Sequence, residues 1–145
     1  MNIELMKETD CEKTAALFKQ CFADPWSLSA LQEMFRVGDY LSFLAQKEGE
    51  ILGYIGMKCV CGEAEITNVA VAPWARRQGM AAALLKRLLQ EAREREIGRI
   101  YLEVRESNEP AIQLYQQVGF QKNGRRKGYY THPKEDALLM IWKER

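Results

Sequence analysis

The stretch that decides the fold is Glu65–Leu89, EITNVAVAPWARRQGMAAALLKRLL. Its first part, Ile66–Val71, is rich in β-branched residues and ends before Pro73, which cannot continue a sheet ladder, so it predicts a strand. After the proline, apolar residues recur at the spacing of one helix face. These residues are Met80, Leu84, Leu85, Leu88 and Leu89. The stretch therefore predicts a strand, a loop and a helix in succession.

The loop, Arg76–Ala81, has the features of an anion site. Gly79 has no Cβ, so a ligand can approach the backbone closely there. The first amides of a helix have no intrahelical partner, and the helix dipole adds partial positive charge at that end. Arg76 and Arg77 add two full charges. The loop therefore predicts a phosphate or pyrophosphate site; the alternative is an ordinary strand–loop–helix with a solvated arginine pair.

The loop sequence narrows the class of phosphate ligand. It lacks the Lys-Ser or Lys-Thr pair of a nucleotide P-loop and the G-x-G-x-x-G of a dinucleotide fold. The motif R-x-x-G-x-A, which follows V-A-V-A-P, resembles the acetyl-CoA pyrophosphate loop of the GNAT superfamily of N-acetyltransferases. The resemblance implies acetyl-CoA as the co-substrate.

Length and composition fit one globular unit. A chain of 145 residues can bury a full core, so we expect a single domain over residues 1–145. No apolar run approaches a membrane span and the N-terminus lacks a secretory signature, so we expect a cytoplasmic protein with no membrane partner. The four cysteines have no C-x-x-C pairing and His132 is the only histidine, so no metal site is predicted.

The small net charge of +1 hides an asymmetry. Residues 1–65 carry 11 acidic and 6 basic side chains, whereas residues 66–145 carry 9 acidic and 15 basic ones. A basic half suits a polyanionic co-substrate and an acidic half, with Asp24, Glu33 and Asp39, suits a cationic acceptor.

The rest of the chain alternates strands and helices, with Ser27 predicted to cap the second helix and Gly38 to end it. The expected order β-α-α-β-β-β-α-β-α-β-β belongs to the α/β class, as a mixed sheet with helices on both faces. Its last strands are expected at residues 99–105, 120–122 and 136–143. Asn123–Lys134, basic and aromatic, is expected to be a mobile loop.

Three residues near the C-terminal half are ambiguous from local pattern alone. Glu103 interrupts an apolar strand, either as a carboxylate paired with Arg105 or as a general base acting directly or through water. Tyr115 lies on the apolar stripe of the next helix and needs no function there. Asn108 is a preferred helix-cap residue.

A set of motifs in order extends the resemblance over nearly the whole chain. The pieces are DPWS, TNVAVAP, RRQGMA, LEVRESN, A-I-x-L-Y, GF, RRKGYY and the closing DALLM. Together they resemble the GNAT enzymes that acetylate protein N-termini, and most closely those acting on the N-terminal alanine of a small-subunit ribosomal protein. Ala81 departs from the pattern, because a glycine is frequent at that loop position.

The resemblance implies roles for individual residues. Glu103 would take the proton of the amine and Tyr115 would protonate the departing thiolate. The backbone of the central strand would pair with the pantetheine arm, and a central-strand amide, most simply that of Val69, would stabilise the oxyanion. The implied co-substrate residues are Val69, Ala70, Val71, Arg76, Arg77, Gln78, Gly79, Met80, Ala81, Ala82 and Asn108.

Other functions remain open on the sequence. The same fold could acetylate a lysine side chain or a small amine, or bind acetyl-CoA without catalysis, although the presence of both Glu103 and Tyr115 argues against a silent module. The basic run Arg125–Lys127 with its following tyrosines is a weak nucleic-acid signal, because a short basic run is usually solvated, and no nucleic-acid partner is expected. The expected partners are acetyl-CoA and a basic, ribosomal protein N-terminus.

Overall fold

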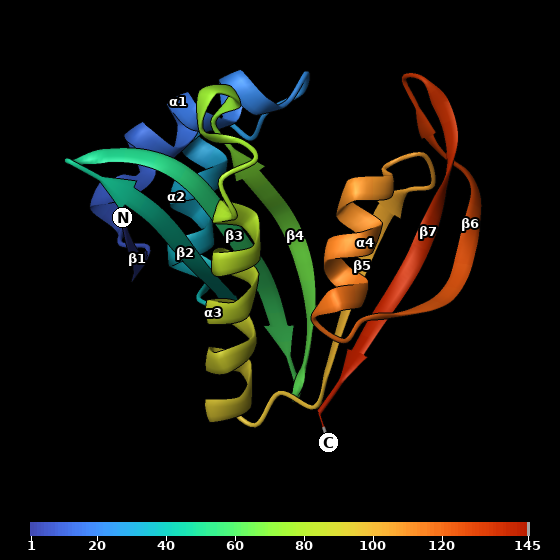
Figure 1. The fold of residues 1–145 in the computed structure, drawn as a ribbon. Helices are drawn as coiled ribbons and strands as arrows, with labels where there is room; N and C mark the ends of the chain where they lie inside the picture. Colours follow the sequence, from blue (N-terminus) through green and yellow to red (C-terminus); the bar gives the residue numbers. More distant parts are fainter. Residues whose placement is uncertain (145) are drawn as a thin grey trace.

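The computed structural model describes residues 1–144 and has the predicted order of strands and helices (Figure 1). The α-helices are α1 (Cys11–Cys21), α2 (Leu28–Val37), α3 (Met80–Glu94) and α4 (Glu109–Gln117), with 3-10 turns at Glu8–Asp10 and Pro73–Ala75. The strands are β1 (Asn2–Leu5), β2 (Tyr40–Lys47), β3 (Glu50–Val60), β4 (Glu63–Val71), β5 (Arg99–Arg105), β6 (Gln121–Thr131) and β7 (Lys134–Lys143). They form one seven-stranded sheet in the order β1-β2-β3-β4-β5-β7-β6.

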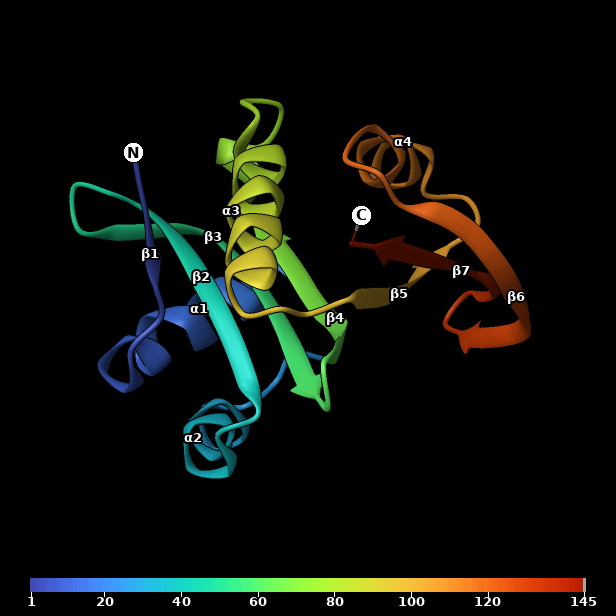
Figure 2. The same ribbon diagram turned by 90° about the horizontal axis from the view of Figure 1, so that it is seen from below.

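Helices cover both faces of this sheet, as predicted. Figure 2 shows α1 and α2 on one face and α3 and α4 on the other. Phe18 of α1 is fully buried against the ring of Tyr54 on β3, with 4.8 Å between ring centroids. Leu84 and Leu88 of α3 are fully buried on the opposite face. Within residues 1–144, no helix has both the length and the apolar character needed to cross a membrane.

Helix α2 begins and ends at the residues that the sequence predicted. The Ser27 hydroxyl accepts a hydrogen bond from the amide of Ala30 at 3.1 Å, which satisfies one of the free amides of the first turn. Gly38 ends the helix with φ 84°, a left-handed conformation that glycine adopts without steric cost. The second helix is therefore predicted correctly at both ends.

The sheet separates between β4 and β5. These strands run parallel but share only three residue pairs, from Glu63 opposite Arg99 to Glu65 opposite Tyr101. Beyond Glu65 the register of β4 against β3 shifts, and Thr67 is the extra residue of a β-bulge. Figure 1 shows the two strands close at this end and diverging toward the carboxyl end of β4. The far half of β4 therefore has a neighbour on one side only.

The prediction of a mobile loop over Asn123–Lys134 is wrong. These residues belong to a hairpin in which β6 and β7 pair antiparallel from Gln121 opposite Ile141 to Thr131 opposite Lys134. The register shifts twice along β6, and Gly124 and Gly128 take positive φ values of 117° and 64°. Those irregularities break the two-residue alternation by which a strand is recognised in sequence.

Candidate active site

The exposed edge of β4 presents backbone groups of alternate residues. The Ala72 amide donates to the Leu52 carbonyl of β3 at 2.8 Å. Hydrogen-bonded pairs alternate along an antiparallel ladder, so Ala70, opposite Tyr54, also bonds to β3, whereas Val69 and Val71 direct their backbone groups to the open edge. An extended ligand chain beside β4 would therefore meet Val69 and Val71. Ala70 supports the strand from β3 rather than facing that edge.

The Arg76–Ala82 segment turns the chain from this edge into α3. Gly79 is the N-cap residue with φ 76°, and no side chain caps the helix. A Cβ built on Gly79 has no atom within 4 Å, so the space around this glycine, at the start of the helix, is open. Arg77 also has positive φ, at 64°. The amides that start α3, at Met80, Ala81 and Ala82, thus have the free electropositive end that an anion requires.

The side chains of this segment are partly engaged by the backbone. Arg76 Nε donates to the Val71 carbonyl at 3.0 Å, and the Cys21 thiol of α1 contacts the same oxygen at 3.4 Å. Gln78 Nε2 lies 3.5 Å from the Trp74 carbonyl. Arg76 therefore holds the end of β4 and leaves Arg77, which is exposed, as the cation projecting from the loop.

Glu103 does not pair with Arg105. Its carboxylate Oε1 lies 3.1 Å from Nε of Arg126 on β6, and its side chain is 19% exposed. Arg105 instead pairs with Glu135. Hydrogen bonding to Glu103 is also the main cause that raises the pKa of Tyr129, which follows Arg126 along β6. The carboxylate is thus held by the hairpin while it remains accessible.

A hollow of about 210 Å³ opens beside this carboxylate. Side chains from β4, β5, β6 and β7 line it, namely Glu65, Tyr101, Leu102, Glu103, Asn123, Arg126, Leu139 and Met140. It lies next to Glu65 and Tyr101, the last residue pair shared by β4 and β5. The hollow therefore places Glu103 beside the point where the sheet separates.

Tyr115 is buried on α4 with its ring 5.6 Å from the ring of Phe120. Burial raises the pKa of Tyr115 to about 12, and the nearby Tyr130 adds to the rise. The pKa of Tyr130 is itself raised by burial and then by Glu103. Tyr130 thus lies within electrostatic reach of both Glu103 and Tyr115. At neutral pH the Tyr115 hydroxyl keeps its proton, which a general acid must do.

Asn108 takes the position that its capping preference predicts. Its Oδ1 accepts a hydrogen bond from the Ala111 amide at 3.3 Å, at the N-terminus of α4, and the residue is exposed. Pro110 follows in the first turn, where its missing amide hydrogen costs no hydrogen bond. The side chain therefore has an observed role in starting the helix.

Sequence reasoning missed the contribution of the β6–β7 hairpin to this site. Arg126, Tyr129 and Tyr130 all lie near Glu103, and Arg125 pairs with Glu106 at 2.6 Å. The run RRKGYY was visible, but its partners come from β5 and the segment after it, which only the sheet pairing reveals. Within residues 1–144, no group of three or more His, Cys, Asp or Glu side chains is arranged to hold a metal ion.

The fold and the site define the class of protein. Residues 11–120 match the acetyltransferase (GNAT) family, and the chain belongs to that family. It is therefore an N-acetyltransferase, and the GNAT fold uses acetyl-CoA as its co-substrate.

Particular relatives narrow the comparison. The ribosomal protein bS18-alanine N-acetyltransferase of Escherichia coli K12 is 34% identical over 141 residues, covering 95% of this chain and 94% of that protein. A Bacillus subtilis protein that carries the same name provisionally is 35% identical over 136 residues, covering 93% and 90%. The crystal structure of the Escherichia coli ribosomal-protein-S18-alanine N-acetyltransferase superposes with a TM-score of 0.87 at 33% identity, covering 98% of this chain and 92% of that one.

Proposed function

We propose that this enzyme transfers the acetyl group of acetyl-CoA to the N-terminal α-amine of a protein, with Glu103 as general base and Tyr115 as general acid. The acceptor we propose is the N-terminal alanine of a small-subunit ribosomal protein, since relatives of 34–35% identity over nearly the full length carry that name. The observation that carries the proposal is the separation of β4 and β5 beyond Glu65, which opens an edge of backbone amides beside a strand bearing Glu103.

The co-substrate would lie along this open edge. The backbone groups of Val69 and the amide of Val71 would pair with the pantetheine arm as an added strand does, since Arg76 and Cys21 already contact the Val71 carbonyl. The uncapped amides at the start of α3 and the Arg77 charge would hold the pyrophosphate. Asn108, at the N-terminus of α4, would contact the coenzyme further along. The open space at Gly79 fits this assignment, because a phosphate needs the room that a side chain would fill.

The reaction would be a direct attack of the amine on the thioester carbonyl. A carbon–nitrogen bond forms, the carbon–sulfur bond breaks, Glu103 accepts the amine proton and Tyr115 donates a proton to the departing thiolate. The edge-facing Val69 amide would stabilise the oxyanion. Holding both reactants beside one strand converts a bimolecular encounter into an oriented one, which supplies much of the rate.

The chemistry of the amine favours an N-terminus over a lysine. Only a neutral amine attacks a thioester, and an α-amine has a reference pKa of about 7.7–8.0 against about 10.4 for lysine. At neutral pH the α-amine is therefore neutral several hundred times more often. Glu103 is a modest base, which suits the easier acceptor. With a ribosomal-protein acceptor, the enzyme would act in the cytoplasm.

The test compares two peptides of the same basic sequence. One begins with a free alanine and contains arginine but no lysine, and the other has a blocked N-terminus and an internal lysine. We expect acetylation at the α-amine of the first, located by mass spectrometry, with rates that fall as salt screens the charges. A blocked peptide without lysine measures background hydrolysis of acetyl-CoA. Faster acetylation of the lysine peptide would reject the N-terminal assignment.

A further inference from the structure

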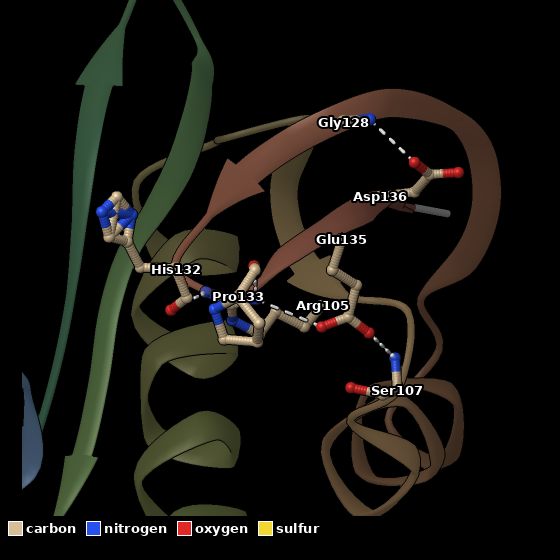
Figure 3. Close-up of polar contacts among 7 residues, drawn as sticks. All are labelled: Arg105, Ser107, Gly128, His132, Pro133, Glu135 and Asp136. Atoms are coloured by element: carbon tan, nitrogen blue, oxygen red, sulfur yellow. Dashed lines mark hydrogen bonds and ion pairs between the residues drawn. The ribbon is translucent and has the colours of Figure 1, made fainter.

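Arg105, at the end of β5, is the central residue of a network that fastens the β6–β7 hairpin to the rest of the sheet (Figure 3). Its Nη1 donates to the Pro133 carbonyl at 2.9 Å and to Glu135 Oε1 at 3.2 Å. Its Nη2 donates to the His132 carbonyl at 3.2 Å. One guanidinium thus holds three groups at the tip of the hairpin.

Glu135 extends the network to the start of α4. Its second oxygen, Oε2, accepts a hydrogen bond from the Ser107 amide at 2.6 Å. Hydrogen bonding from Ser107, first through its side chain and then through this amide, lowers the pKa of Glu135, and Arg105 adds to the lowering. Figure 3 shows Glu135 between Arg105 and Ser107, with one carboxylate oxygen directed to each. The carboxylate therefore joins β5, β7 and the turn that leads into α4.

Arg105 also contacts the face of the hairpin that looks toward Glu103. Its guanidinium carbon lies 4.3 Å from the centroid of the Tyr130 ring. Tyr130 is near both Glu103 and Tyr115, and Arg126 of the same strand pairs with Glu103. The hairpin that this network fastens is thus the element that closes one side of the hollow beside Glu103.

We propose that Arg105 and Glu135 are positioning residues for the acceptor: they fix the β6–β7 hairpin over Glu103 and so set the geometry in which the amine enters. The inference rests on the proposed function, because the acceptor is taken to bind in the hollow beside Glu103. Neither residue lines that hollow, so both act through the hairpin.

The chemistry of the pair suits this role better than a role in global stability. Both side chains are partly exposed, at 31% and 17%, and exposed ion pairs contribute little to the free energy of unfolding. The planar fork of arginine holds several acceptors in one fixed arrangement, whereas a lysine ammonium cannot reproduce that arrangement while it stacks on a tyrosine. Loss of the pair should therefore loosen the hairpin and leave the rest of the sheet folded.

Steady-state kinetics of Arg105→Lys and Glu135→Gln test the proposal, with the alanine peptide and acetyl-CoA varied in turn. We expect kcat/KM for the peptide to fall about ten- to a hundredfold, as expected when a reacting group is misplaced by about 1 Å. The KM for acetyl-CoA should stay unchanged. Arg95→Gln is the matched control, because it removes an ion pair of 2.8 Å with Glu91 on α3, away from the hairpin.

Two further measurements separate positioning from loss of folding. The double variant should lose less than the product of the two single losses, because the two side chains share one ion pair. Hydrogen exchange should become faster in residues 121–134 and remain the same in β2 and β3. An unchanged kcat/KM for the peptide, or a rise in the KM for acetyl-CoA as large as that for the peptide, would overturn the proposal. Hydrogen exchange is measured without an acceptor peptide, so it tests the fastening of the hairpin even if the proposed acetylation of a protein N-terminus is wrong.

Discussion

Nε of Arg126 lies 3.1 Å from Oε1 of Glu103, so the carboxylate that we propose as general base is ion-paired across the hollow. Arg126 is 59% exposed and has its guanidinium carbon 5.7 Å from the centroid of the Tyr129 ring. We expect this exposed arginine to move when a cationic amine arrives, so that the carboxylate would then be shared with the acceptor. Until that moment the pair would keep Glu103 directed into the hollow.

Replacing Glu103 by glutamine should therefore remove proton acceptance while it keeps the shape of the side chain. We expect the loss in kcat to be largest at low pH, where most of the amine is protonated and a base matters most. Rates measured from roughly pH 6 to pH 9 give the ratio of wild type to variant. A ratio that stays flat across pH, with chemistry limiting turnover, would speak against Glu103 as the base.

Tyr115→Phe removes only a hydroxyl group from a buried ring. If Tyr115 protonates the thiolate, turnover should fall by roughly 10²- to 10⁴-fold, the range for general acid catalysis. The affinity for acetyl-CoA should change little, because the ring still packs against Phe120. Full activity of this variant would show that Tyr115 packs in the core and has no role in catalysis.

Tyr115 should also make unfolding depend on alkaline pH. Its folded-state pKa of about 12 lies above the value of about 10 for an unfolded tyrosine, so its contribution is fully present below pH 10 and is lost as pH rises through 12. Between pH 8 and pH 11 the free energy of unfolding should fall by about 1.4 kcal/mol from this residue. Urea titrations of wild type and Tyr115→Phe isolate this contribution, since all other groups are shared.

Two substitutions at Gly79 separate charge from bulk at the proposed pyrophosphate site. Asparagine and aspartate adopt the left-handed φ of 76° more readily than other residues with side chains, and a Cβ at this position has no neighbouring atom within 4 Å. Gly79→Asp should weaken acetyl-CoA binding strongly, because its charge repels phosphate, and Gly79→Asn should weaken it less. The Kd for acetyl-CoA, measured by calorimetry, distinguishes these outcomes. Equal affinities for the two folded variants and wild type would show that the pyrophosphate does not bind at this loop.

Any side chain at Gly56 on β3 should destabilise the fold. A Cβ there would overlap the Tyr54 hydroxyl and lie 2.9 Å from Ser42 Oγ, beneath the β4 bulge. Gly56→Ala should therefore cost about 1–3 kcal/mol of stability, and adding Tyr54→Phe should recover part of it. Gly98→Ala is the control, since its nearest contact is 4.0 Å away. Thermal unfolding with no difference between Gly56→Ala and the control would contradict this packing.

Much of the fold could be predicted because local chemistry and pattern agree over most of the chain. The strand Arg99–Arg105 and the start of α3 at Met80 lie where the change of period placed them. The hairpin could not be predicted, because two register shifts and two glycines of positive φ obscure its alternation. The hairpin is held to the sheet by the ion pair of Arg105 with Glu135 and by the pairing of β7 with β5, which are contacts between distant segments.

The candidate site likewise contains some residues that local sequence predicts and others that only the tertiary structure reveals. The glycine loop and Asn108 are recognisable from local sequence, since a left-handed glycine and a helix cap act within a few residues. The ion-pair partner of Glu103 cannot be recognised from local sequence, because Arg126 lies on a strand whose register no local rule fixes. Likewise, only the ladder alternation shows that Val69 and Val71, and not Ala70, face the open edge.

The short contact between β4 and β5 limits how cooperatively the two halves of the sheet unfold. Three residue pairs join a half containing β1 to β4 to a half containing β5 to β7, so the backbone bonds that would resist their independent opening are few. A co-substrate bound between the two halves would add backbone hydrogen bonds as a further strand does, and the two halves would then unfold in one cooperative transition. The enzyme would then be most rigid at the moment of catalysis and would loosen each time the spent coenzyme departs.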